Sequence, residues 1–277
     1  MGALPQANPG DYLQGDRLIV ERHLAAVLPG DGSPVSSAMR YAVLGGGQRI
    51  RPLLAVRTAR MLKAEQPAVL TAAAAVELLH CASLIVDDLP CMDNALARRG
   101  RPATHVAFGE PTALLAAFGL VALSARCVLD CDVALRERAR LVEFQSLLLR
   151  ALDSGGLIEG QSLDLELSGA ERERHRAHIN DLKTVPLFVL ALRAGMLFSA
   201  APPRQRAALL RFGREFGAAF QMADDLADRE AADAAPVCEQ LESARRCLDE
   251  FGPRAGGLCE LIDYLHEAVT EKNRCHR

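Results

Sequence analysis

Residues 68–93 read AVLTAAAAVELLHCASLIVDDLPCMD, a long apolar run that ends in a cluster of aspartates. Apolar residues recur in it at three- and four-residue steps, which predicts a helix, and a proline stops that helix just after Asp87 and Asp88. The run is long enough to cross a membrane, but Glu77 and His80 lie inside it and are strongly disfavoured in lipid. We therefore predict a buried core helix and no membrane span.

The rest of the chain shows the same helical periodicity. Of the 277 residues, 50% are hydrophobic and only 4% are aromatic, and alanine and leucine dominate, which favours helices over a sheet. The segments with helical spacing are 12–28, 50–62, 69–89, 105–129, 136–152, 182–198 and 204–226. No alternation of Val, Ile and Thr predicts a strand. We expect one all-α domain over residues 1–277, with 1–10 flexible and the apolar-poor segment 229–236 a mobile loop.

Charge and cysteine content narrow the class of protein. A net charge of −3 and a pI near 6.2 create no global basic field, so nucleic acid is not an expected partner. Any phosphate must be held by local cations. The eight cysteines form no Cys-x-x-Cys pair, which favours reduced thiols over disulfides or zinc. No basic segment followed by an apolar stretch marks a signal peptide in residues 1–16, so we expect a cytoplasmic protein.

The aspartates of interest fall into two clusters far apart in the chain. They are Asp87, Asp88 and Asp93 in the first and Asp224, Asp225 and Asp228 in the second. Anions at a helix C-terminus repel one another and oppose the helix dipole, and apolar residues surround the second cluster, so both need cations. Mg2+ takes oxygen ligands from one or two carboxylates together with substrate phosphates. Two facing clusters therefore predict a shared magnesium and diphosphate site, with a solvated acidic loop and a solvated helix face as the alternatives.

Local cations accompany these clusters. Arg98, Arg99 and Arg101 follow the first one, and guanidinium groups bind phosphate oxygens in pairs, although surface arginines are the alternative interpretation. Residues 45–52, GGGQRIRP, place glycines and two arginines before a helix start, where backbone N–H groups and the arginines could hold a phosphate. Lys183, one of three lysines in the chain, opens a very apolar helix, where a buried cation needs an anion.

Taken in order, these motifs resemble trans-isoprenyl diphosphate synthases. The resemblance covers residues 41–228 and rests on GGQRIRP (46–52), ELLH (77–80), DDLPCMD (87–93), RRG (98–100), GQ (160–161), KT (183–184) and FQMADDLAD (220–228). Without that context, the Gly-Gln pair is interpreted equally well as a cap and turn between helices. The resemblance implies helices around a deep central apolar cavity, with the two aspartate motifs facing each other at its mouth, and a homodimer.

The resemblance also implies a role for each matching residue. Mg2+ would be bound, directly or through water, by Asp87, Asp88, Asp93, Asp224, Asp225 and Asp228. An allylic diphosphate would be contacted by Arg98, Lys183, Thr184 and Gln221, and isopentenyl diphosphate by Arg51, His80 and Arg99, with Gln48 in the same site. The catalytic set would be Asp87, Asp88, Asp93, Arg98, Lys183, Asp224 and Asp225. Metal and cations would stabilise the departing diphosphate, and the isopentenyl double bond would attack the allylic carbocation in an apolar cavity.

The chain departs from the family pattern at two places. Gln48 stands where the family usually has a lysine, and the lysines expected beyond Asp228 are missing. These departures favour a second hypothesis, a catalytically weak partner subunit of another prenyl synthase, which the six aspartates oppose. A third hypothesis, a class I terpene cyclase, is opposed by the Asp224-Asp225 pair, since such cyclases typically carry an Asn/Ser/Glu motif there.

Product length is predicted from the residues one helical turn before Asp87. Ala82 and Ser83 stand there, and side chains at that place extend along the cavity that takes the growing tail. In the family a bulky aromatic residue there stops growth at farnesyl. The small residues therefore resemble a geranylgeranyl diphosphate synthase, starting from dimethylallyl, geranyl or farnesyl diphosphate, with farnesyl diphosphate as the alternative product.

Overall fold

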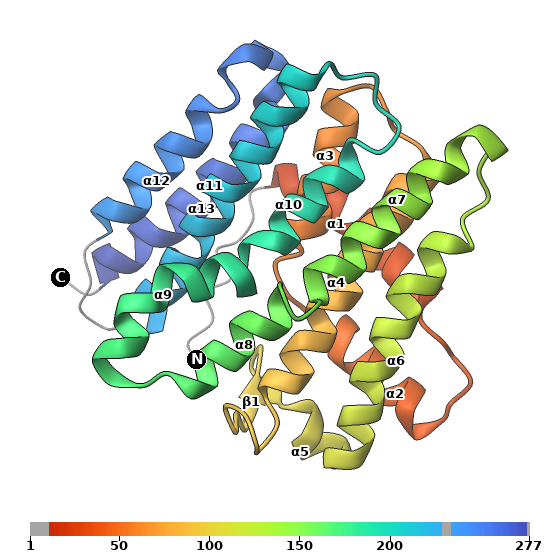
Figure 1. The fold of residues 1–277 in the computed structure, drawn as a ribbon, viewed down its shortest axis with the longest axis vertical. Coiled ribbons are helices and arrows are strands. Elements are labelled where there is room, and N and C mark those ends of the chain that lie inside the picture. The colour runs from red at the N-terminus through yellow and green to blue at the C-terminus, as the bar shows by residue number, and fades with distance from the viewer. Residues whose placement is uncertain (1–10, 229–233, 276–277) are drawn as a thin grey trace.

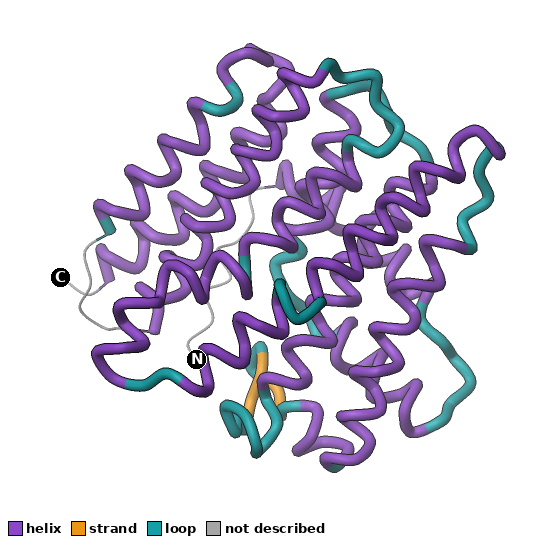
Figure 2. The backbone as a smooth tube through the Cα atoms, in the orientation of Figure 1, coloured by secondary structure: helices purple, strands orange, loops and turns teal. Residues whose placement is uncertain are grey.

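The computed structural model describes residues 11–228 and 234–275 of the chain, and within them nearly all regular structure is helical (Figures 1 and 2). The predicted all-α class is therefore confirmed. Residues 1–10 and 229–233, for which we expected flexibility and a mobile loop, lie outside the described part. No disulfide joins the described cysteines, in agreement with the predicted thiols.

The described part of the chain forms thirteen α-helices and one 3-10 helix. They are α1 (Asp11–Val27), α2 (Pro34–Leu44), α3 (Ile50–Met61), α4 (Pro67–Asp87), α5 (Thr104–Phe108), α6 (Glu110–Leu129), α7 (Leu135–Leu152), α8 (Leu157–Glu166), α9 (Gly169–Lys183), α10 (Val185–Gly195), α11 (Pro203–Asp228), α12 (Ala235–Arg246), the 3-10 helix η1 (Asp249–Ala255) and α13 (Gly256–Cys275). The sequence predicted no strand, yet β1 (Ala97–Arg98) and β2 (Arg101–Pro102) form a short antiparallel hairpin.

The predicted helical segments need three corrections. Segment 105–129 is broken at Gly109, whose φ of 83° does not fit a helix, into α5 and α6. Segment 182–198 does not start a helix at its lysine: Lys183 ends α9, and α10 starts after Thr184 with a proline in its first turn. The expected loop 229–236 ends earlier than predicted, because Ala235 and Pro236 already belong to α12.

Helix α4 forms the centre of the fold. Ala72, Ala73, Ala75 and Val76 are fully buried, and their small side chains let α4 pack closely against α3, α6 and α10. By length and composition α4 and α6 could each cross a membrane, but 67% of the apolar window of α4 is buried in the protein. The prediction that 68–86 is a core helix is therefore confirmed.

A second close contact joins α3 to α10. A Cβ at Gly195 would lie 2.4 Å from the carbonyl oxygen of Ala55 and 2.6 Å from Cβ of Thr58, so only glycine allows this approach. On the other side of α3, the helices α11, α12 and α13 pack side by side (Figure 1) around a separate apolar cluster. The long helices α4 and α11, which carry the two aspartate motifs, are thus both anchored in buried clusters.

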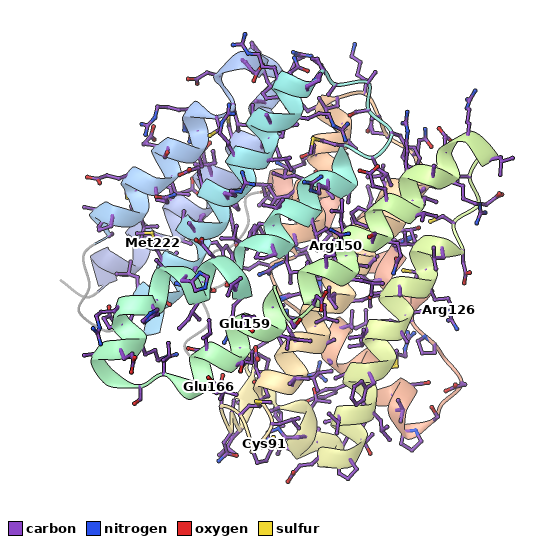
Figure 3. All side chains as sticks on the ribbon, viewed as in Figure 1. Cys91, Arg126, Arg150, Glu159, Glu166 and Met222 are labelled. Carbon is purple, nitrogen blue, oxygen red and sulfur yellow. The ribbon has the colours of Figure 1, made fainter. Side chains whose placement is uncertain are left out.

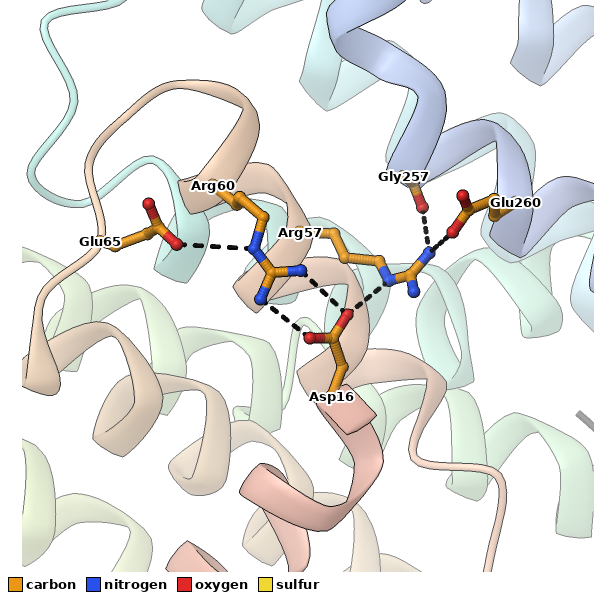
Figure 4. Close-up of polar contacts among 6 residues, drawn as sticks. All are labelled: Asp16, Arg57, Arg60, Glu65, Gly257 and Glu260. Atoms are coloured by element: carbon orange, nitrogen blue, oxygen red, sulfur yellow. Dashed lines mark hydrogen bonds and ion pairs between the residues drawn. The ribbon is translucent and has the colours of Figure 1, made fainter. Parts of the chain in front are cut away.

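A buried ion-pair network ties α1, α3 and α13 together (Figure 4). Asp16 of α1 accepts hydrogen bonds from Arg57 at 3.0 Å and from Arg60 at 2.8 Å. The Arg57 side chain, only 3% exposed, also donates to the carbonyl of Gly257 at 2.7 Å and pairs with Glu260 of α13 at 2.5 Å. Because a buried guanidinium needs several acceptors, this network fixes the first and last helices on α3.

Candidate active site

The first aspartate cluster lies where α4 ends. Asp87 is the last residue of the helix, and Asp88 follows it with only 2% of its surface exposed. The backbone N–H of Asp93 donates to the carbonyl of Asp87 at 2.9 Å, which folds the turn back onto the helix end. From β1, Arg98 donates through Nε to Asp88 Oδ1 at 3.0 Å. The structure therefore brings these three aspartates and Arg98 to one place.

The carboxyl group of Asp87 is in an environment that disfavours its charge. Its pKa is raised from 3.8 to about 6, chiefly by burial and also by the nearby carboxylates of Asp93 and Asp88, while Lys183 and Arg98 act in the opposite direction. A positively charged ligand placed here would offset both the burial and the repulsion. The end of α4 is thus suited to bind a cation.

Lys183 lies beside this cluster and is held by a residue to which the sequence analysis gave no role. Its Nζ donates to Asp164 Oδ2 of α8 at 2.7 Å, and Arg172 of α9 donates to Asp164 Oδ1 at 2.7 Å. Burial acts to raise the pKa of Asp164, but these two hydrogen bonds hold it below its ordinary value. The spacing from Gly160-Gln161 to Asp164 was the signal that could have pointed to this residue.

The cap-and-turn interpretation, which placed Gly160 and Gln161 between helices, is wrong, because both residues lie inside α8. A Cβ at Gly160 would lie 2.8 Å from Cβ of Leu182 and 2.9 Å from the backbone nitrogen of Lys183. The glycine therefore lets α8 pack directly against the end of α9, which sets the position of Lys183. Gln161 is 7% exposed, and its side-chain amide has no hydrogen-bond partner among the described residues.

Thr184 connects Lys183 to the second aspartate motif. The Thr184 hydroxyl donates to Gln221 Oε1 at 2.6 Å, and Gln221 Nε2 donates in turn to Asp225 Oδ1 at 3.0 Å, one turn further along α11. Asp225 also faces Arg176 of α9 at 3.9 Å. Asp228 is the last residue of α11, and its side chain lies outside the described part. Thr184 is thus linked by hydrogen bonds to the second motif, and Lys183 lies within electrostatic reach of Asp87 in the first.

Arg51 lies between α3, α10 and α11 in an unusual environment for a cation. Its guanidinium stacks 4.5 Å from the ring centre of Phe188 and 5.9 Å from that of Phe220. Burial and Arg99 lower its pKa, whereas Glu77 and Asp224 of the second motif act to raise it. Its Nε finds no hydrogen-bond acceptor among the described residues. A buried N–H without a partner is costly, so an anionic ligand would stabilise this group.

His80 is neutral in this environment. Burial and the surrounding arginines, Arg51 and Arg99 foremost, hold its pKa well below the ordinary value. A neutral imidazole beside two guanidiniums offers a hydrogen bond without adding charge. Its neighbour Ser83 donates to the carbonyl of His80 at 2.9 Å.

The glycine-rich segment does not offer both of its arginines to a ligand, as the sequence had suggested. Arg49 is 2% exposed and is occupied by Glu21 at 2.6 Å and by Glu77 at 2.8 Å. Burial acts to lower its pKa, but these carboxylates raise it above the ordinary value. The φ of 57° at Arg49 turns its side chain into the core, a geometry that periodicity does not reveal. Gln48 is half-buried, and its backbone carbonyl accepts a hydrogen bond from Arg17 at 3.1 Å.

The donor set fits Mg2+ and does not form a complete metal cage. Within residues 11–228 and 234–275, no three carboxylate, imidazole or thiol groups converge at metal-binding distance. Mg2+ does not require such convergence, since it keeps several waters and uses one or two carboxylates together with substrate phosphates. The raised pKa of Asp87 and the purely oxygen donors of both motifs match this mode of binding.

Known proteins match this chain over most of its length. A crystal structure described as an FPP/GFPP synthase from Zymomonas mobilis is similar with a TM-score of 0.84 and 30% identity, covering 93% of this chain and 98% of that one. A geranyltransferase from Legionella pneumophila gives a TM-score of 0.80 and 34% identity over 95% of both chains. The geranylgeranyl diphosphate synthase of Pseudescherichia vulneris is 40% identical over 233 residues, which are 82% of this chain and 75% of the relative.

The all-α fold is that of the isoprenoid synthases, the class to which the similar solved structures belong. The family model described as polyprenyl synthetase matches residues 33–236. The chain belongs to this family, and the resemblance found in the sequence is confirmed.

The raised pKa of Asp87 gives a pH-dependent prediction for the ligand-free protein. Above about pH 6 the carboxylate is charged in both the folded and the unfolded state, so the folded state carries the full penalty. Below pH 3.8 the group is protonated in both, and the penalty vanishes. Asp87→Asn should therefore raise the free energy of unfolding at pH 7 by about 1–2 kcal/mol, after allowance for solvent screening.

Urea denaturation between pH 4 and 7 measures this difference, with the exposed Asp181→Asn as the control. The gain from Asp87→Asn is expected to grow as the pH rises toward 6 and then to level off. A gain that is independent of pH, or a loss of stability at pH 7, would contradict the electrostatic origin.

Proposed function

We propose that this chain is a magnesium-dependent prenyltransferase that condenses isopentenyl diphosphate with an allylic diphosphate to give geranylgeranyl diphosphate. The allylic substrate is dimethylallyl, geranyl or farnesyl diphosphate. The proposal rests on Lys183 and Thr184, which connect the two acidic motifs. Lys183 is within electrostatic reach of Asp87 at the end of α4, and Thr184 is hydrogen-bonded through Gln221 to Asp225 of α11. The geranylgeranyl product is supported by the curated relative from Pseudescherichia vulneris.

In this reaction the chain's own side chains hold two diphosphates. Lys183 and Arg98 bind the allylic diphosphate and stabilise the negative charge that develops as its C–O bond breaks. Thr184 and Gln221 orient the same group. The aspartates of both motifs would hold Mg2+, which would supply further positive charge to the leaving diphosphate.

The second diphosphate is assigned to the neighbouring basic residues around Arg51 and His80. Arg51, Arg99 and the neutral His80 hold isopentenyl diphosphate, whose double bond attacks the allylic carbocation. Loss of a proton then restores a double bond in the product. The stacked rings of Phe188 and Phe220 under Arg51 exclude water from this side of the site.

A catalytically weak partner subunit is the second candidate function. Gln48, where a lysine is usual, favours it, because one positive charge is absent from the isopentenyl diphosphate site. Against it stand the hydrogen bonds from Thr184 through Gln221 to Asp225 and from Lys183 to Asp164, which keep the allylic site assembled.

The tail cavity is assigned to the space beside Ala82 and Ser83 on α4. Ala82 is 3% exposed and packs among apolar side chains of α2 and α6, while Ser83 is half-buried. A bulky residue at Ala82 would therefore overpack this cluster as well as shorten the cavity. Ser83 is the better position for a size test.

A homodimer through α6 is part of the proposal. This helix is as apolar as α4, yet only 39% of its apolar window is buried within the chain. Leu115 and Phe118 are 55% and 64% exposed on its outward side, which Arg126 also marks in Figure 3. An apolar face of this kind is stabilised when a second copy of the same surface covers it. We further propose a cytoplasmic location, which agrees with the absence of disulfides among the described cysteines.

The direct test incubates the purified chain with Mg2+, isopentenyl diphosphate and each allylic diphosphate in turn. Geranylgeraniol is the expected alcohol after phosphatase treatment, and EDTA should abolish its formation. Lys183→Gln should lower kcat/KM by about 100-fold, because it removes a charge from the leaving diphosphate. The exposed Lys63→Gln serves as its control. A chain that elongates no starter would leave the partner-subunit function.

Product length is tested by Ser83→Phe, which should move the main product from geranylgeraniol to farnesol because the ring blocks the path of the tail. Ser83→Ala keeps the position small and should leave the product unchanged. Chromatography of the dephosphorylated products distinguishes them. An unaltered product distribution in Ser83→Phe would refute the assigned cavity.

The dimer is tested by Phe118→Asp, which places a charge in the centre of the exposed α6 face and should yield monomers in sedimentation velocity. Phe118→Leu keeps the face apolar and should remain dimeric. Monomers in the unaltered chain at micromolar concentration would disprove the assembly.

A further inference from the structure

Arg101 is held in an unusual position on the β1–β2 hairpin. Its guanidinium lies 4.0 Å from the ring centre of Tyr41 in α2, so a cation–π contact fixes one face of the group. The Tyr41 hydroxyl donates to the carbonyl of Pro102 at 2.9 Å and thereby fastens the hairpin to α2. Stacking uses the face of a guanidinium and leaves its N–H edge available for hydrogen bonds.

This guanidinium lies against the glycine-rich segment before α3. A Cβ at Gly45 would come within 2.8 Å of Arg101 Nη1, and a Cβ at Gly47 would come within 2.8 Å of Arg99 Cζ. Arg99 also donates to the backbone carbonyl of Gly46. Two guanidiniums therefore flank three successive glycines, and Gln48 is the next residue in the chain.

The hairpin and the glycines line a small, partly open cleft of about 30 Å³. The polar side chains that line it are those of Tyr41, Asp88, Arg98, Arg99, Arg101 and Thr104. The single carboxylate among these is already paired with Arg98. Within the described part of the chain, no carboxylate pairs with Arg101. Three cations against one anion leave the cleft with an excess of positive charge, which an anionic ligand would balance.

The cleft adjoins the proposed isopentenyl diphosphate site through Arg99. This guanidinium lowers the pKa of both Arg51 and His80, so it lies within electrostatic reach of both residues. A diphosphate held by Arg51 and Arg99 would thus extend toward the N–H edge of Arg101.

We propose that Arg101 is a further binding residue for the diphosphate of isopentenyl diphosphate, and that it supplies the positive charge that Gln48 lacks. The inference rests on the proposed function, since it names an additional contact in the same substrate site. It also explains how the chain binds this substrate with a neutral residue after its three glycines.

The test compares Arg101→Gln with the unaltered enzyme in steady-state kinetics. The KM for isopentenyl diphosphate should rise about tenfold, because a charge-assisted hydrogen bond is lost, while the KM for the allylic substrate stays the same. Arg204→Gln, which removes an arginine with an 84% exposed side chain at the start of α11, is the matched control. Titration calorimetry with isopentenyl diphosphate alone gives a second readout that requires no turnover.

A rescue variant separates a charge in the site from a merely structural role. Gln48→Lys added to Arg101→Gln should restore the KM for isopentenyl diphosphate to within about threefold of the unaltered enzyme. If Arg101→Gln does not fold, Arg101→Lys, which keeps one charge but loses the paired N–H groups, gives the same comparison.

The outcomes distinguish the two hypotheses. No elongation by the unaltered chain would overturn the proposed function, and the role of Arg101 with it. Normal elongation with an unchanged KM for isopentenyl diphosphate in Arg101→Gln would overturn the role of Arg101 alone. An equal rise in both KM values that Gln48→Lys does not reverse would show that Arg101 only holds the hairpin in place, and would overturn it as well.

Discussion

The burial of α4 is the constraint on which the rest of the structure depends. Its alanine-rich middle is surrounded by α3, α6 and α10, and this packing fixes the point at which the helix ends. Three carboxylates are thereby placed at a helix C-terminus, where the helix dipole, desolvation and the neighbouring carboxylates all oppose the charge of Asp87. The apolar core offsets that cost, so the stability of the core is what makes an acidic site possible here.

Around the end of α4, hydrogen bonds and charge interactions between side chains orient the polar residues of the site. Lys183 donates a hydrogen bond to Asp164 and also interacts electrostatically with Asp87. The Thr184 hydroxyl donates to Gln221, which donates in turn to Asp225 of the second motif. Each cation is thus oriented before any ligand arrives. Preorganised groups of this kind need little rearrangement when negative charge develops on a leaving group.

The sequence predicted the features that depend on periodicity and local chemistry. The core helix 68–86, the all-α class and the family membership followed from apolar spacing and from the order of short motifs. The features that it missed depend on backbone angles or on distant partners. The positive φ at Gly109 breaks one predicted helix, and that at Arg49 turns a predicted phosphate ligand toward Glu21 and Glu77.

Asp164 is a site residue that the sequence did not predict, because its role depends on distant partners. Its importance comes from Lys183, 19 residues away, and from the glycine contact that brings α8 against the end of α9. The spacing from Gly160-Gln161 to Asp164 was a local signal, but neither of these two contacts is visible in a window of local sequence. The hairpin of two-residue strands was missed for a similar reason, since segments so short carry no alternation that could be recognised.

The network around Arg57 has a consequence for the order in which parts of the chain fold. One acceptor comes from Asp16 of α1, but the carbonyl of Gly257 and the carboxylate of Glu260 lie 200 and 203 residues after Arg57, in α13. Closing so long a stretch of chain costs conformational entropy before these contacts can form. The docking of α13 on Arg57 is therefore expected to come late in folding.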